Sequence, residues 1–263
     1  MIPILTSIFF IFGLIIGSFL NVVIYRLNTA RSLGGRSACM SCQSKLSWYE
    51  LIPVLSFITL QGRCRSCKTK ISIQYPLVEF ITGLVFALLF AKLQAEYDFF
   101  SLAFVGMYAY YAVMFALLLV IAVYDLRHKI IPDSLVFIFC LFAFIGLFLF
   151  TNVFPFLSPH IPSLLEFLAG PLIALPFALF WLISGGRWMG LGDAKLALGI
   201  GWLLGISLAF SSLVIAFWSG AAAGLVLIVF SKNYGMKSEI PFAPYLVLGA
   251  FLAFIFDLRL FPL

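Results

Sequence analysis

The sequence predicts an all-α polytopic membrane protein with about eight transmembrane helices and a small cytoplasmic four-cysteine zinc module between the first two. Of its 263 residues, 64% are hydrophobic and only 10% are charged, and the mean hydropathy is +1.17. A soluble domain of this size cannot hide so much apolar surface inside one core. Most of that surface must therefore face lipid, and one long polar connection carries four of the five cysteines.

Eight apolar runs are candidates to cross the bilayer, which takes about 20 mostly apolar residues. They cover residues 4–25, 77–93, 100–124, 134–150, 163–184, 194–206, 207–230 and 241–258. The sixth run is short and almost continuous with the seventh. The first run has no basic residue before it and no small-residue cleavage site after it, so it is expected to be a retained helix rather than a secretory signal.

The distribution of lysine and arginine predicts the orientation. If the N-terminus lies outside, all 16 of these residues except Lys92 and Arg259 fall on the inner side. Positively charged connections are retained in the cytoplasm, so this side is expected to be cytoplasmic. The net charge of +6 is then a topology signal and needs no nucleic-acid partner to explain it.

The long connection, residues 26–75, contains two CxxC pairs separated by 21 residues, Cys39 with Cys42 and Cys64 with Cys67. Two such pairs supply the four thiolates of a tetrahedral zinc site. A site filled by four cysteines is expected to be structural, because a catalytic zinc needs an open coordination position. Disulfides are the alternative, but the predicted cytoplasmic location is reducing. Cys140 stands alone in an apolar run and is expected to pack there without reacting.

Two aspartates, Asp125 and Asp193, stand where apolar runs meet short polar junctions on the predicted cytoplasmic side. An acidic residue at the membrane edge requires a partner or a function. Asp125 follows the run 100–124, and Asp193 ends the glycine-rich stretch Gly190-Leu191-Gly192-Asp193. We expect Asp193 to be the N-cap of the next helix, with glycines that leave room for a peptide to approach.

Two neighbouring carboxyl groups can hydrolyse a peptide, because like charges a few Å apart cannot both ionise and therefore share one proton. The pair is thus a candidate catalytic site. The alternatives are an ion pair of Asp125 with Arg127 or Lys129, and a helix-capping role alone for Asp193. His128 and His160 fall on opposite sides in this topology, which argues against a two-histidine site.

Several ordered motifs resemble those of the type IV prepilin peptidases, also called leader peptidase/N-methyltransferases. The two CxxC pairs and the two aspartates belong to this set. The other motifs are Gly17-Ser18-Phe19-Leu20-Asn21-Val22-Val23-Ile24-Tyr25-Arg26-Leu27, Trp48-Tyr49-Glu50-Leu51-Ile52-Pro53, Gly62-Arg63-Cys64, Tyr75-Pro76-Leu77-Val78-Glu79, Asp125-Leu126-Arg127, Ile131-Pro132-Asp133 and Gly190-Leu191-Gly192-Asp193-Ala194-Lys195-Leu196. The resemblance covers nearly the whole chain. Met40 and Asn28 stand where that family commonly has proline, and neither position touches the thiolates or the aspartates.

The resemblance implies a GxGD aspartyl protease of the bacterial inner membrane, with Asp125 and Asp193 as its catalytic pair. It implies cleavage of a basic leader from prepilins and pseudopilins after a glycine, followed by methylation of the new N-terminal residue by S-adenosyl-L-methionine. Such substrates belong to type IV pili and type II secretion. The expected division is a first helix (1–25), a methyltransferase-associated zinc module (26–75) and a transmembrane peptidase domain (76–263).

The candidate positions for the methyl donor are Asn21, Glu50, Gly62, Arg63 and Glu79. The sequence has no glycine-rich dinucleotide-type fingerprint that would locate that cofactor. Structural roles are the alternative, with Asn21 as a helix–helix hydrogen bond, Glu79 as a partner of loop arginines and Gly62 as a turn.

Two other functions compete with this interpretation. One is a leader peptidase that does not methylate, in which the zinc module is purely structural. The other is a transporter or assembly factor without enzymatic activity, whose aspartates bind ions.

Overall fold

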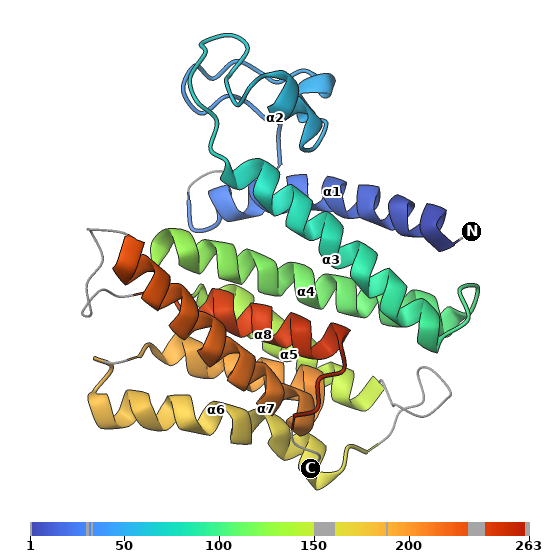
Figure 1. The fold of residues 1–263 in the computed structure, drawn as a ribbon, viewed down its shortest axis with the longest axis vertical. Coiled ribbons are helices and arrows are strands. Elements are labelled where there is room, and N and C mark those ends of the chain that lie inside the picture. Colours follow the sequence, from blue (N-terminus) through green and yellow to red (C-terminus); the bar gives the residue numbers. More distant parts are fainter. Residues whose placement is uncertain are drawn as a thin grey trace. The chain divides into compact units, whose positions relative to one another are not determined.

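The computed structural model describes residues 2–29, 32, 34–149, 161–187, 189–230 and 240–260. Within these ranges the chain forms helices and two isolated β-bridges but no strand, which confirms the all-α prediction. The elements are α1 (Ile2–Arg26), η1 (Trp48–Leu51), α2 (Leu55–Thr59), α3 (Gln74–Glu96), α4 (Leu102–His128), α5 (Asp133–Leu149), α6 (Leu164–Ser184), α7 (Leu191–Phe230) and α8 (Ala243–Ile255), as labelled in Figure 1.

Five helices, α1, α3, α4, α6 and α7, are long and apolar enough to cross a membrane. Two further apolar helices are shorter, α5 with 17 residues and α8 with 13. The sixth and seventh predicted runs form the single 40-residue helix α7, in which Gly205 has non-helical angles (φ 74°, ψ 168°). Glycine tolerates this φ without steric cost, so the helix can change direction near the predicted boundary. The count of eight crossings stays a prediction.

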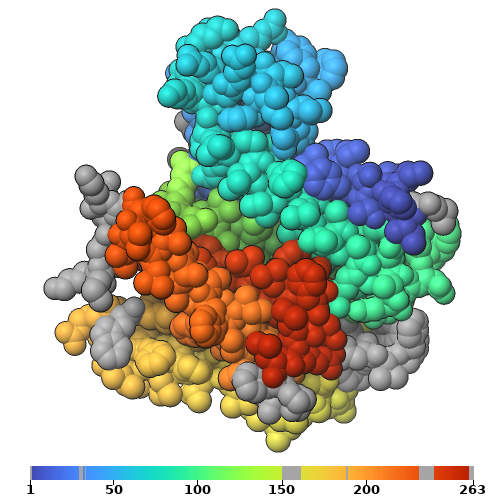
Figure 2. Space-filling view, viewed as in Figure 1, coloured from blue at the N-terminus to red at the C-terminus, as the bar shows by residue number. Residues whose placement is uncertain are grey.

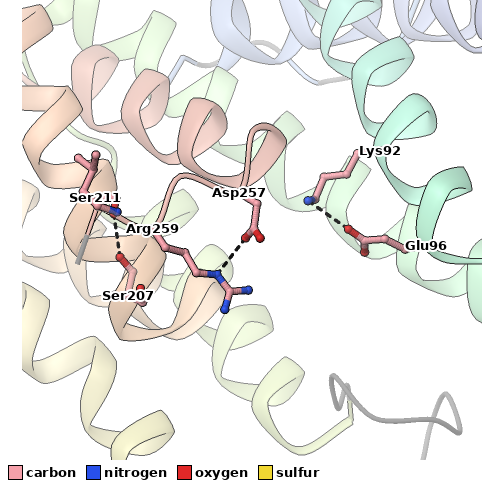
Figure 3. A network of polar contacts seen from close by, with 7 residues as sticks. Lys92, Glu96, Ser207, Ser211, Asp257 and Arg259 are labelled. Atoms are coloured by element: carbon pink, nitrogen blue, oxygen red, sulfur yellow. Dashed lines mark hydrogen bonds and ion pairs between the residues drawn. The ribbon is translucent and has the colours of Figure 1, made fainter. Parts of the chain in front are cut away.

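The two basic residues that the topology leaves outside are each neutralised by a nearby acid. Lys92 pairs with Glu96 at 3.1 Å, and Arg259 pairs with Asp257 at 3.2 Å (Figure 3). Neither segment therefore carries a locally uncompensated positive charge, in agreement with the expected orientation. Three inner-side basic residues and one histidine that entered the topology argument lie outside the described residues: Arg31, Lys232, Lys237 and His160.

The chain divides into two compact units, residues 1–99 with 107–112, and residues 100–106 with 113–263. In the first unit α1 packs along α3, and the two backbones approach closely because a Cβ on Gly13 would lie 2.8 Å from the Cα of Gly83. Phe9 stacks on Phe90 with ring centroids 4.4 Å apart. The segment between α1 and α3 fills its own small volume within this unit (Figure 2).

In the second unit, α5, α6 and α8 all pack against α7 (Figure 1). The indole N–H of Trp202 in α7 donates a hydrogen bond to the carbonyl oxygen of Phe167 in α6 at 3.0 Å. On the other side, Phe115 of α4 packs edge-on against Phe251 of α8, with centroids 5.3 Å apart. Helix α8 thus contacts both α4 and α7, the two helices that carry Asp125 and Asp193.

Candidate functional site

Both predicted aspartates are buried at helix ends in the second unit. Asp125 is 4% exposed in the last turn of α4, which continues one turn beyond the predicted run to His128. Asp193 is 9% exposed in the first turn of α7. The prediction that Asp193 is an N-cap is wrong, because the chain enters the helix at Leu191, directly after Gly190. Asp193 is the third helical residue and its side chain points into the protein.

The Asp125 carboxyl group is held by the start of another helix. Its Oδ2 accepts a hydrogen bond from the backbone N–H of Ala243, the first residue of α8, at 3.3 Å. The first N–H groups of a helix have no intrahelical partner, so a carboxylate is a natural acceptor there. Among the described residues Asp125 forms no ion pair, and Lys129 instead ends α4 in the left-handed conformation. The ion-pair alternative for Asp125 is therefore not observed.

The Asp193 carboxyl group is buried and incompletely satisfied. Its Oδ1 has no hydrogen-bond partner among the described residues. The charge of Asp125 acts on Asp193, so the two carboxyl groups are close enough to interact. A buried polar atom without a partner is costly and rare, and it is common where a ligand or substrate completes the hydrogen bonding.

The glycine before Asp193 has a packing role that the sequence did not indicate. A Cβ on Gly192 would lie 2.9 Å from the Cβ of Ile131, in the connection between α4 and α5. Gly190 has open space instead, with its nearest neighbour at 3.9 Å. Only Gly190 therefore fits the expectation of free room, whereas Gly192 lets the start of α7 lie directly against Ile131.

An ion pair that sequence reasoning missed lies beside the aspartates. Lys195 Nζ is 2.7 Å from Asp133 Oδ1, which joins α7 to the first residue of α5. Both residues stand in the quoted motifs, but Asp133 was interpreted only as a helix cap. The signal available in the sequence was that opposite charges follow each of the two aspartates within a few residues.

The four predicted cysteines come together in the first unit. Their sulfur atoms all lie within 4.8 Å of one another, and Cys39 Sγ is 3.8 Å from Cys67 Sγ. Tetrahedral coordination with bonds of about 2.3 Å places sulfurs about 3.8 Å apart. The four side chains of Cys39, Cys42, Cys64 and Cys67 therefore fit a metal ion.

The two CxxC segments are an internal repeat. In each, the first cysteine N–H donates to a carbonyl five residues later, Cys39 to Ser44 at 3.0 Å and Cys64 to Thr69 at 2.9 Å. An isolated antiparallel bridge closes each turn, Ala38 with Lys45 and Arg63 with Lys70. The sequence signal was the recurrence of Cys-x-Ser-Cys-x-x-Lys after 25 residues, which spacing alone did not reveal.

Hydroxyl groups near the thiols favour the metal-binding form. The Thr69 hydroxyl, 3.2 Å from the thiol of Cys67, lowers the pKa of that thiol to about 6. The Ser44 hydroxyl likewise lowers the pKa of Cys42, whose sulfur is 3.0 Å away. Since the thiolate is the metal ligand, these hydrogen bonds prepare both exposed cysteines for coordination.

Two of the five candidate methyl-donor positions are carboxylates with backbone partners. Glu79, 8% exposed, accepts a hydrogen bond from the N–H of Val54 at 2.8 Å. Val54 has φ 60° and ψ −50°, which is unusual for a β-branched residue, so Glu79 holds a strained turn of the connection against α3. Glu50 accepts from the N–H of Ser47 at 2.8 Å and completes the capping box of η1.

The other three candidates also have structural roles. Gly62 has φ 64° and faces the Phe57 ring, and Arg63 lies in the second bridge. Asn21 is 1% exposed and donates to the carbonyl of Tyr75 at 3.0 Å, which links α1 to α3. Its Oδ1 is buried without a partner among the described residues. The five positions do not form one evident cradle, and their assignment to a methyl donor stays a prediction.

Comparison with known proteins covers both units. Residues 11–93 match the bacterial peptidase A24 N-terminal domain, and residues 112–228 match the type IV leader peptidase family. A prepilin leader peptidase/N-methyltransferase of Bacillus subtilis is 33% identical, over 95% of this chain and 94% of its own length. Proteins of the same name from Aeromonas hydrophila and Pseudomonas aeruginosa are 33% and 30% identical, over 95% and 92% of this chain and 90% and 87% of theirs. No solved structure matches significantly.

The contact between Gly192 and Ile131 predicts a steric coupling. Gly192→Val is expected to lower the free energy of unfolding by about 1–3 kcal/mol, because the new side chain overlaps Ile131. Ile131→Ala in the same chain makes room and is expected to recover part of this loss. Thermal unfolding in detergent of both single variants and the double variant measures the coupling, and strictly additive effects would contradict it.

Proposed function

The chain belongs to the type IV leader peptidase family, and on this premise we propose that it removes the leader peptide from type IV prepilins and pseudopilins and then N-methylates the new N-terminus. The observation that carries the peptidase half is the buried pair of Asp125 and Asp193, with an unsatisfied oxygen on Asp193. We further propose that cleavage follows a glycine and takes place at the cytoplasmic face of the bacterial inner membrane.

For hydrolysis we propose an aspartic mechanism in which the two carboxyl groups share one proton. The ionised carboxylate takes a proton from water as the water oxygen attacks the peptide carbonyl carbon. The protonated partner donates its proton to the carbonyl oxygen. The tetrahedral intermediate then collapses, the C–N bond breaks, and the amine leaves with a proton returned from the first carboxyl group.

The surroundings of the pair support this division between a fixed and an available carboxyl group. The Ala243 N–H holds one oxygen of Asp125, which orients that side chain. Asp193 Oδ1 has no protein partner among the described residues and is therefore available to water or to the substrate carbonyl. Either aspartate can begin as the acid, because the pair titrates as a unit.

For the cysteine cluster we propose a structural Zn²⁺ held by Cys39, Cys42, Cys64 and Cys67. Four thiolates fill a tetrahedral zinc site and leave no position for water or substrate. The connection between α1 and α3 has little apolar core of its own, and η1 and α2 contain no buried residue. Metal binding would then supply much of the free energy that folds this segment.

For methylation we propose S-adenosyl-L-methionine, which supplies an electrophilic methyl group for the amine exposed by cleavage. The candidate positions remain Asn21, Glu50, Gly62, Arg63 and Glu79. Asn21 is the strongest of them, since its Oδ1 is an unused acceptor. Functionally we propose that residues 26–75 serve methylation and residues 76–263 form the peptidase, with residues 1–25 as the first membrane helix.

Replacing either aspartate tests the peptidase mechanism. Asp193→Asn and Asp125→Asn keep the size of the side chain but cannot share a proton, so cleavage is expected to fall by about three orders of magnitude or more. Purified protein in nanodiscs with a full-length prepilin provides the assay, and accumulation of uncleaved precursor is the readout. Asp257→Asn, at an exposed ion pair, is the control. Unchanged processing in Asp193→Asn would instead support a transporter or assembly factor.

Removal of one thiol tests the metal. Cys64→Ser is expected to abolish stoichiometric zinc, because a hydroxyl is a far weaker zinc ligand than a thiolate. Elemental analysis of purified wild type and variant measures the metal content, with Cys140→Ser as the matched control for a cysteine outside the cluster. The variant should also be cut faster by proteases within residues 34–73. Full zinc occupancy in Cys64→Ser would reject the four-cysteine site.

A methyl-transfer assay separates the bifunctional enzyme from a simple leader peptidase. Zinc-replete protein and labelled S-adenosyl-L-methionine are expected to methylate a pilin peptide that has already been cleaved. Asn21→Leu should weaken binding of S-adenosylhomocysteine, measured calorimetrically, without preventing leader cleavage. If wild type transfers no methyl group under these conditions, the protein is a leader peptidase only.

A further inference from the structure

The ion pair of Asp133 and Lys195 joins the two chain segments that carry the aspartates. Asp133 begins α5, eight residues after Asp125, and Lys195 lies in α7, two residues after Asp193. The distance between Lys195 Nζ and Asp133 Oδ1 is 2.7 Å. The pair therefore bridges the connection that follows one aspartate and the helix that begins with the other.

Two further contacts join the same segments. Ile131 fills the space left by Gly192, directly before Asp193. The thiol of Cys140 in α5 donates to the backbone carbonyl of Lys195 at 3.3 Å. Lys195 is thus held by α5 through both its side chain and its main chain.

The exposure of the pair argues against a mainly stabilising role. The Lys195 and Asp133 side chains are 43% and 73% exposed, and exposed ion pairs contribute little to overall stability. Apolar packing against α5, α6 and α8 already holds α7 in the unit. Catalysis is more demanding than stability, because a displacement of about 1 Å can cost on the order of 100-fold in rate.

We propose that Asp133 and Lys195 are positioning residues, whose ion pair fixes the start of α7 and thereby the Asp193 carboxyl group relative to Asp125. Neither residue donates or accepts the proton that is transferred. This inference rests on the proposed function, since it concerns the geometry of the same two aspartates.

The test measures kcat and KM separately for full-length protein in nanodiscs with a prepilin substrate. Lys195→Met and Asp133→Asn are each expected to lower kcat by about 10-fold with KM within about twofold, because geometry and not substrate affinity is changed. The exchange variant, Asp133→Lys with Lys195→Asp, restores opposite charges. It is expected to recover kcat to within about threefold of wild type, while all thermal midpoints stay close to that of wild type.

A second ion pair provides the matched control. Asp257 and Arg259 form a similarly exposed pair at 3.2 Å in the same unit, seen in Figure 3. Reversing both charges, Asp257→Arg with Arg259→Asp, is expected to leave kcat and KM unchanged. High salt should lower kcat of the wild type, because it screens exposed charges, and should have less effect on Lys195→Met.

Three results would overturn the inference. Wild-type kcat in both single variants would show that the ion pair is dispensable. A rise in KM alone in Asp133→Asn, for substrates with a basic leader, would make Asp133 a substrate contact. Loss of kcat in proportion to a lower thermal midpoint, without recovery in the exchange variant, would leave only a structural role. If Asp193→Asn itself still cleaves prepilin, the proposed function fails, and that result is separate from these three.

Discussion

A carboxyl group inside an apolar helical unit must either find hydrogen-bond donors or share a proton with another carboxyl group, and the second unit is arranged around this requirement. Asp125 obtains a donor from the first N–H of α8. Asp193 has no donor for one of its oxygens and is exposed to the charge of Asp125. Neither residue would remain buried if α4, α7 and α8 were not packed together, so the packing of these helices maintains the chemistry of the pair.

The same requirement explains why the helix starts are so tightly joined. Helix α7 carries Asp193 in its first turn, where small shifts of the backbone move the carboxyl group directly. Ile131 packs where Gly192 has no side chain, and Asp133 reaches Lys195 one turn into the helix. A loop of ordinary mobility would not keep two carboxyl groups within proton-sharing distance, whereas a packed loop with an ion pair can.

The cysteine-bearing connection meets a different constraint, since it is short of apolar core. Its two turns are copies of one local structure, and their four sulfurs converge at a spacing that suits a tetrahedral metal. Glu79 then attaches this segment to α3 through the strained backbone at Val54. Residues that resemble a cofactor site in sequence, such as Glu50 and Glu79, are thus already engaged in shaping the segment.

Composition and spacing alone determined the class of protein, the approximate helical runs, the cysteine cluster and the pair of aspartates, because hydropathy and ligand spacing are local properties of the chain. Only the tertiary structure decided that α7 is one helix bent at Gly205, that Asp193 is a first-turn residue, and that Gly192 serves packing. It also decided that Asp133 pairs with Lys195 and that Ala243 supports Asp125. These contacts join residues 62 and 118 positions apart, and no local pattern encodes such distances, since they arise only when separate helices bury their apolar faces against one another.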